Sequence, residues 1–95
     1  MNAVRRSILE RLVVRMEAMK CGYTYIERSL DGGVLNATLR PFESFRECCA
    51  AAERAVNTAL ASTLGRIDVV PCEYDEARCH PQMMTVLKTF RHSPL

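Results

Sequence analysis

The stretch FESFRECCAAAERAVNTALASTLG, residues 42–65, decides the fold of this chain. Ser44 precedes Glu47 by three residues, the spacing of a capping box in which the Ser hydroxyl accepts from the Glu47 N–H. Gly65 follows Leu64, at the position where a left-handed residue commonly closes a helix. The spacing therefore predicts a helix that packs one face on a β-sheet. That face recurs at steps of three and four residues: Phe45, Cys49, Ala52, Val56, Ala59, Leu60 and Thr63.

Size and composition indicate one small globular domain. The chain has 95 residues, of which 48% are hydrophobic and 25% charged, as in ordinary soluble proteins. The net charge of +2 is too weak to imply a nucleic acid or membrane partner by itself. No apolar run approaches the roughly 18 residues of a membrane span, so no membrane partner is expected. We therefore predict a single domain over residues 1–95, with residues 92–95 frayed.

Cysteine usage favours a reducing compartment. A secreted disulfide framework usually has an even number of cysteines, whereas this chain has five. In a cytoplasmic protein, cysteine serves as a small apolar residue. We therefore expect a cytoplasmic location. The five are Cys21, Cys48, Cys49, Cys72 and Cys79.

Residues 2–20 have the pattern of an amphipathic helix. Apolar side chains recur on one stripe at about 100° per residue. Arg11 and Arg15 lie one turn apart beside this stripe, where they could clamp a phosphate or a carboxylate. Such a pair is more often the solvated shoulder of a surface helix. The stripe consists of Ile8, Leu9, Leu12, Met16 and Met19.

Residues 23–41, YTYIERSLDGGVLNATLRP, predict a β-hairpin. Asp31-Gly32 is a favoured pair for a two-residue type I′ turn, which would place Leu30 opposite Gly33. A three-residue Asp31-Gly32-Gly33 loop is the alternative and would change the cross-strand partners.

Alternation then divides the predicted hairpin into two faces. The face with the aliphatic residues should lie against the helices, and the opposite face should be open to solvent. The first contains Thr24, Ile26, Arg28, Leu30, Leu35, Ala37 and Leu39. The second contains Tyr23, Tyr25, Glu27, Ser29, Asn36, Thr38 and Arg40.

The remaining segments predict a third strand over residues 66–74 and a last helix. Pro71 cannot donate to a ladder, which favours an edge strand or a strand broken midway. Asp75 can cap a short turn, and Pro81 suits the first turn of a helix over residues 81–91. An alternating interpretation of residues 84–90 makes this segment a fourth strand instead. The predicted fold is a single α+β domain of order α-β-β-α-β-α, with a small sheet covered on one face by helices.

Candidate catalytic and metal sites are weak. Cys72, Cys79 and His80 are the zinc candidates, with Cys48 and Cys49 as completing ligands, but the spacing is too long for a zinc knuckle. Acidic neighbours raise a thiol's pKa and oppose a thiol enzyme. The clustered acids read as a charged surface loop: Asp68, Glu73, Asp75 and Glu76. We expect no enzyme activity, no cofactor and no metal.

Protein binding is the function that these residues favour most. Tyr and Arg on an open sheet face are enriched at protein interfaces. The expected role is a small inhibitor or adaptor of a larger protein machine, as in many phage or mobile-element proteins, and the open face also allows a homodimer. The first alternative is a nucleic-acid-binding regulatory domain that stacks bases on the same tyrosines, and the second is a thiol enzyme. The predicted binding residues are Tyr23, Tyr25, Thr38 and Arg40, followed by Arg11 and Arg15.

Overall fold

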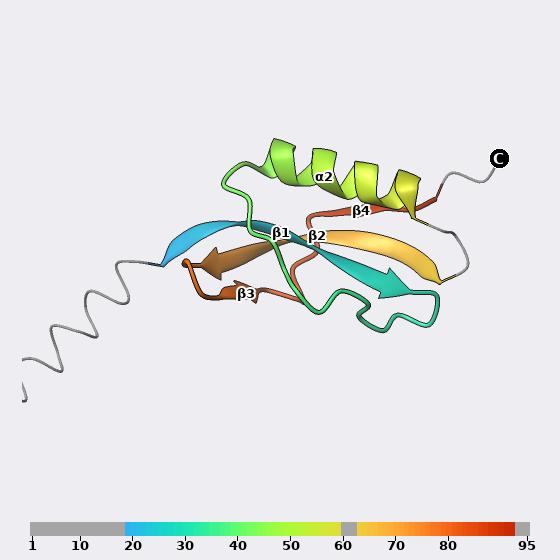
Figure 1. The fold of residues 1–95 in the computed structure, drawn as a ribbon, viewed down its shortest axis with the longest axis horizontal. Helices are drawn as coiled ribbons and strands as arrows, with labels where there is room; N and C mark the ends of the chain where they lie inside the picture. The colour runs from blue at the N-terminus through green and yellow to red at the C-terminus, as the bar shows by residue number, and fades with distance from the viewer. Residues whose placement is uncertain (1–18, 60–62, 93–95) are drawn as a thin grey trace, which may run out of the picture.

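One helix and a four-stranded antiparallel sheet make up the described part of the chain (Figure 1). The structure is a computed structural model that describes residues 19–59 and 63–92. The predicted arrangement of three helices over a sheet is therefore wrong. The predicted first helix lies mostly outside the described residues, and Lys20 already belongs to a strand. The elements are β1 (Lys20–Ser29), α2 (Phe45–Thr58), β2 (Leu64–Tyr74), β3 (Cys79–Pro81) and β4 (Lys88–Phe90).

The strand β2 is the centre of the sheet. It pairs antiparallel with β1 from Lys20 opposite Tyr74 to Arg28 opposite Arg66. Its other edge pairs with β3 near one end and with β4 near the other. The expectation of an edge strand is therefore wrong, although the extended structure over residues 66–74 is confirmed.

Pro71 explains why β3 and β4 are separate strands. Gln82 N–H donates to the Pro71 carbonyl with an N···O distance of 2.9 Å, which is typical of a strand ladder. Pro71 has no N–H to return, so the ladder loses a bond at this point. The ladder resumes where Leu87 N–H donates to the Val69 carbonyl at 2.8 Å. A central strand thus accommodates proline at a break in its partner.

The start of α2 follows the predicted cap, but its end does not. Ser44 is the N-cap, and its hydroxyl accepts from the Glu47 N–H at 3.3 Å. The helix ends at Thr58, well before Gly65. Gly65 lies in β2 instead, where an added Cβ would come within 2.7 Å of the Ser29 carbonyl oxygen. Glycine is needed there because two backbones approach closely, and not because a helix ends.

The buried face of α2 is rotated from the predicted one. Cys48, Ala52 and Val56 are its buried residues, whereas Cys49 is only partly buried and Phe45 is 38% exposed. These side chains form one core with residues of both neighbouring strands and of the loop before the helix. The core consists of Phe42, Cys48, Ala52, Val56, Leu64, Ile67 and Val69, with Tyr23, Tyr25 and Phe90 packed against it.

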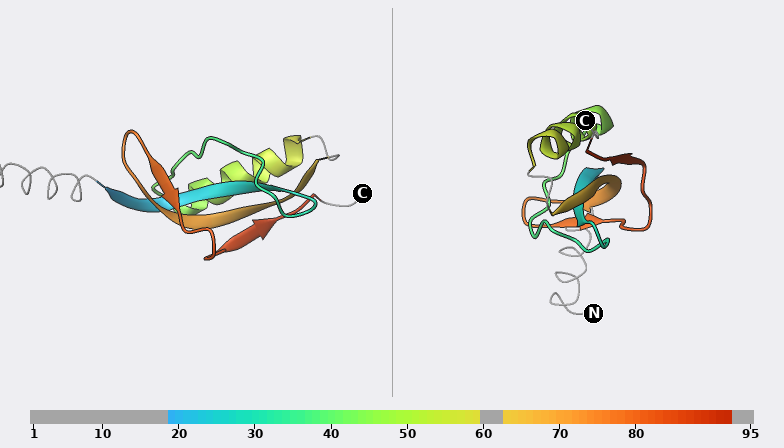
Figure 2. Two further views of the ribbon diagram at one scale, coloured as in Figure 1. Left: turned by 90° about the horizontal axis from the view of Figure 1, so that it is seen from below. Right: turned by 90° about the vertical axis from the view of Figure 1, so that its right-hand side faces the viewer.

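The face of β1 that meets α2 is the opposite of the predicted one. Tyr23 and Tyr25 lie toward the helix, and the alternating residues Thr24 and Ile26 are fully buried on the other side. Figure 2 shows the loop after β1 and the strand β3 on that side, away from α2. Leu30 was predicted to be buried with them but is 77% exposed. Both faces of β1 are therefore covered, whereas the alternation pattern assumes that one face is open to solvent.

The turn after β1 differs from both predicted turns. Ser29 N–H donates to the Gly33 carbonyl at 2.8 Å, so the loop consists of Leu30, Asp31 and Gly32. Gly32 has φ of 94°, the left-handed conformation that closes a three-residue hairpin loop. The Asp31 carboxylate accepts from Gly33 N–H at 3.0 Å and fixes the turn. The pairing is consequently shifted by one residue from the predicted register.

The second half of the predicted hairpin is an irregular segment along the outer edge of β1. It bridges β1 at Val34 and again at Phe42. Between these points the Asn36 side chain replaces the main chain, because its Oδ1 accepts from Glu27 N–H at 2.9 Å and its Nδ2 donates to the Tyr25 carbonyl at 3.1 Å. The Asn36 amide thus takes the place of main-chain ladder bonds along this edge of β1.

The predicted last helix is wrong, and the alternative of a fourth strand is correct for residues 88–90. The open edge of β2 offers main-chain partners to residues 79–90, which outweighs their local helix propensity. The predicted turn at Asp75 is confirmed, because its carboxylate accepts from the N–H groups of Ala77 and Arg78, both at 2.8 Å.

Candidate binding surface

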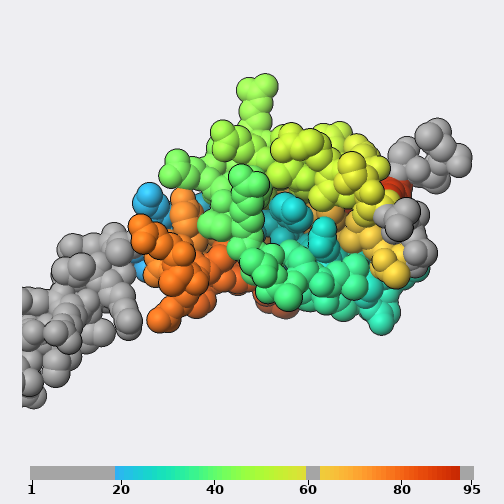
Figure 3. All heavy atoms as spheres, viewed as in Figure 1, coloured from blue at the N-terminus to red at the C-terminus, as the bar shows by residue number. Residues whose placement is uncertain are grey.

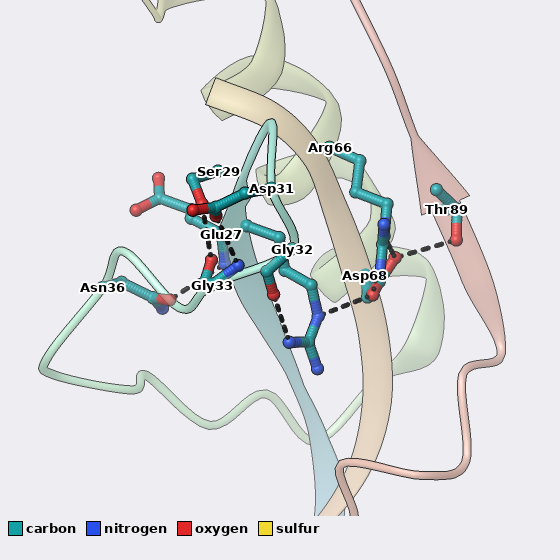
Figure 4. Close-up of polar contacts among 10 residues, drawn as sticks. Glu27, Ser29, Asp31, Gly32, Gly33, Asn36, Arg66, Asp68 and Thr89 are labelled. Atoms are coloured by element: carbon teal, nitrogen blue, oxygen red, sulfur yellow. Dashed lines mark hydrogen bonds and ion pairs between the residues drawn. The ribbon is translucent and has the colours of Figure 1, made fainter. Parts of the chain in front are cut away.

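A buried carboxylate links three strands on the side of the sheet away from α2. Asp68 in β2 is 1% exposed. Its oxygens accept from Arg28 Nε of β1 at 3.1 Å and from Thr89 Oγ1 of β4 at 2.9 Å. Arg66, two residues earlier in β2, donates its Nε–H toward both oxygens at 3.1 and 3.2 Å. Figure 4 shows Arg66 and Thr89 directed toward Asp68.

The hydrogen bonds keep this carboxylate ionised. Burial alone raises the pKa of Asp68, but the bonds from Thr89, Arg66 and Arg28 outweigh it and hold the pKa below its ordinary value. Two guanidinium groups and one carboxylate leave one surplus positive charge in this cluster. The side chain of Arg28 is 17% exposed and that of Arg66 is 35% exposed, so the surplus charge is accessible mainly through Arg66.

The turn after β1 holds Arg28 in place. Its Nη1 donates to the Gly32 carbonyl at 3.0 Å, while its Nε is bound to Asp68. The guanidinium is thus bound at two points, by the turn and by β2. Val34 lies directly opposite Arg28 across the bridge, and residues directly opposite each other share a face. An apolar side chain therefore flanks the charged cluster.

Exposed apolar residues gather around this turn. Leu30 is 77% exposed, Val34 50% and Leu35 46%. The start of β2 lies against the same turn, because a Cβ on Gly65 would stand 3.0 Å from the Leu30 Cα. In the space-filling view, the teal atoms of the turn adjoin the yellow-orange atoms at the start of β2 (Figure 3). We name this area the β1-turn surface, defined by Leu30, Val34, Leu35, Arg28 and Arg66.

The tyrosines predicted to bind a partner do not lie on an open face. The Tyr23 ring packs edge-on against Phe45 of α2, with a centroid distance of 5.4 Å. Tyr25 lies 6.3 Å from the ring of Phe42, and both tyrosines pack against the core. Burial raises the pKa of Tyr25, and the carboxylate of Glu27 adds to the rise. The tyrosine face is therefore covered by α2 and not open as expected, and the role of these two residues in binding a partner stays a prediction.

The arginine and threonine residues predicted beside them lie elsewhere. Thr38 and Arg40 are exposed residues of the irregular segment, not of a strand. The Arg40 guanidinium lies over the Phe42 ring, 5.0 Å from its centroid. The main-chain carbonyl of Arg40 accepts a hydrogen bond from the Thr24 hydroxyl. Arg11 and Arg15 lie outside the described residues, so their predicted role stays a prediction.

The strand geometry separates His80 from the other two weak zinc candidates, Cys72 and Cys79. Cys79 and His80 are consecutive residues of β3 and project to opposite faces. No group of three His, Cys, Asp or Glu side chains within residues 19–59 and 63–92 could hold a metal ion. Cys72 is 2% exposed, and its burial, with the neighbouring Cys79 thiol, raises its pKa to about 12. This thiol is protonated at neutral pH.

A hollow lies between α2 and β4. It has a volume of about 430 Å³, with Phe45 and Cys49 on the helix and Phe90 on the strand among its lining residues. Charges of both signs flank it, since Arg46, Lys88 and Glu53 also line it. This groove is shallow and has no surplus of buried charge.

Asp68 was missed because it was grouped with the surface acids by its position in the sequence. Two signals could have found it. Asp68 stands between Ile67 and Val69 in an apolar strand, and an ionised acid at such a position needs paired donors. Arg66 lies two residues away and therefore on the same face of that strand.

No family model matches the chain, and neither the curated proteins nor the solved structures give a significant match. Within the residues that the structure describes, no helix has both the length and the apolar character that a membrane span requires.

Proposed function

We propose that this chain is a non-enzymatic protein-binding module, an inhibitor or adaptor of a larger protein, that docks through its β1-turn surface. The observation that carries this proposal is the exposure of three apolar side chains in and just after the turn that holds Arg28. Protein interfaces are enriched in arginine, and their centres are apolar. Leu30, Val34 and Leu35 supply the apolar contact area, and Arg66 supplies directional donors.

Rigidity supports the same function. Arg28 is bound to both Gly32 and Asp68, and the turn itself is fixed by the Asp31 carboxylate. A partner that docks here would order few additional side chains, which lowers the entropy cost of association. The buried Cys72 thiol, with its pKa of about 12, agrees with a role that does not use thiol chemistry.

The test is affinity capture from a lysate of the source cell, with nuclease treatment and with two variants. We expect the wild-type chain to retain one stoichiometric protein after nuclease treatment, and Leu35→Asp to lose it, because a charge would then face an apolar interface. Met84→Asp is the matched control. Met84 is 96% exposed and lies in the loop before β4, so this variant should capture the partner as the wild type does.

The other outcomes identify other functions. Loss of every captured molecule on nuclease treatment would indicate a nucleic-acid-binding domain. An empty bait that elutes as a dimer in size-exclusion chromatography would indicate self-association. Equal capture by wild type and Leu35→Asp would exclude the β1-turn surface as the docking site.

A further inference from the structure

We propose that Arg66, held beside Arg28 by Asp68, binds one carboxylate of the protein partner, so that the partner presents an acidic residue flanked by apolar ones to the β1-turn surface. This inference rests on the proposed function and names the chemistry that the surface recognises. Three features of the cluster carry it: unused donors, a fixed geometry and a single surplus charge.

The unused donors lie on Arg66. Its Nε–H is directed to the two oxygens of Asp68. Its two Nη atoms make no hydrogen bond to any residue in the ranges 19–59 and 63–92. A guanidinium carries five N–H donors, so four of those of Arg66 have no partner among the described residues. The side chain is 35% exposed, which gives a ligand access to them.

Asp68 fixes the direction of these donors. A planar guanidinium held at Nε cannot turn freely, so its Nη edge keeps one orientation. Arginine donates to carboxylates through two parallel N–H bonds, and this geometry needs an oriented edge. The buried Asp68 is itself held by β1 and β4 through Arg28 and Thr89. The ligand would therefore meet a preorganised site.

The single surplus charge favours a carboxylate over a phosphate or a nucleic acid. One carboxylate neutralises the cluster completely. A phosphate dianion would exceed the surplus charge, and its second negative charge would have no counter-charge in the cluster. Nucleic acid binding depends on several phosphate contacts to clustered cations. Here Asp31 stands in the same turn as the Gly32 carbonyl that binds Arg28, so the surroundings of the pair are not uniformly basic.

The exposed apolar side chains near the arginines limit which residues the partner can present. Val34 lies opposite Arg28 and is half exposed, and Leu30 follows β1 directly. Burying apolar area beside a charge-assisted hydrogen bond excludes water and strengthens that bond. An Asp or Glu residue with aliphatic neighbours in a peptide segment has both components.

The test is a titration of two short peptides, acetyl-Leu-Asp-Leu-amide and its Asn counterpart, followed by NMR of the arginine Nε–H signals. We expect the Asp peptide to shift the Arg66 signal saturably, and the Asn peptide to bind about tenfold more weakly, since a charge-assisted hydrogen bond is worth about 1.4 kcal/mol more. Arg66→Gln should lose this preference. Arg54→Gln, an exposed change on α2, should keep it.

Comparison of the two peptides on the wild-type chain remains decisive if Arg66→Gln fails to fold. Equal binding of both peptides, or tighter binding of inorganic phosphate than of the Asp peptide, would overturn the carboxylate site. This failure is distinguishable from that of the proposed function. If Leu35→Asp loses the captured partner while the wild type shows no preference for the Asp peptide, the docking surface stands and the carboxylate site falls.

Discussion

On the side of the sheet that α2 covers, Ala52 and Val56 pack against Ile67 and Val69; on the other side, Asp68 binds side chains from three strands. The first side is held by apolar contact, which is non-directional and declines gradually as area is lost. The second is held by a network of directional bonds around a buried charge. Such a network is stabilising only while every member has its partner.

The two sides should therefore respond differently to small changes. A shortened apolar side chain leaves a cavity, and its neighbours relax into part of it. A missing carboxylate leaves two arginines with no counter-charge, and no relaxation replaces the charge. The difference also bears on function, because the proposed docking surface lies on the side that depends on an intact hydrogen-bond network around Asp68.

Replacing Asp68 should have the largest effect. Asp68→Ala leaves Arg28, which is mostly buried, without its carboxylate, and loss of one partner from a buried pair costs about 3–5 kcal/mol of unfolding free energy. Urea denaturation followed by circular dichroism measures this cost. Glu53→Ala, an exposed acid on α2, is the control and should change the free energy by less than about 0.5 kcal/mol.

Acid should weaken the same network. The folded pKa of Asp68 lies below its ordinary value, so its contribution to stability is complete above that ordinary value, 3.8, and is lost as the pH falls through the lower folded pKa. Below about pH 4, wild type should therefore lose stability more steeply with falling pH than Asp68→Ala does. Parallel pH profiles for the two proteins would contradict the ionised network.

Shortening the core should have an intermediate effect. Val56 is 2% exposed and is the last buried residue of α2. Val56→Ala removes two methyl groups and should lower the unfolding free energy by about 2 kcal/mol. Its stability difference from wild type should not vary with pH, in contrast to Asp68→Ala. A loss that grew with acidity would show that the two sides are coupled.

Changing Asn36 should have the smallest effect. Asn36→Ala removes both side-chain bonds to the edge of β1 and should cost about 1–2 kcal/mol, close to the net value of two hydrogen bonds. Asn36→Asp keeps the acceptor for Glu27 N–H but places a carboxylate against the Tyr25 carbonyl. It should be no more stable than Asn36→Ala, and a fully stable Asn36→Asp would exclude the donated bond. Denaturation midpoints measure both.

Local signals in the sequence predicted local structure well. Ser44 and Glu47 define the start of α2 because capping depends only on residues within one turn. Asp75 forms its turn for the same reason. Gly65 misled the prediction of the helix end, because its role is a close approach between β2 and the end of β1, distant in sequence.

The site could not be predicted because it depends on which side of the sheet is covered. Alternation placed Tyr23 and Tyr25 together, as the structure does, but it cannot tell which face the helix occupies. The irregular segment after β1 covers Thr24 on the second face, where the Arg40 carbonyl accepts from the Thr24 hydroxyl, whereas a simple hairpin leaves that face open. The three residues that meet at Asp68 come from three strands, and their pairing is a tertiary property.

The amide of Asn36 has a consequence for the behaviour of the protein at high concentration. β1 is ten residues long, and a free edge of that length would invite pairing with strands of other molecules, the first step toward fibrous aggregates. Asn36 occupies the Glu27 N–H and the Tyr25 carbonyl, and Phe42 occupies both main-chain groups of Tyr23. An incoming strand would find these groups already bonded, so the middle of this edge gives no continuous template for growth.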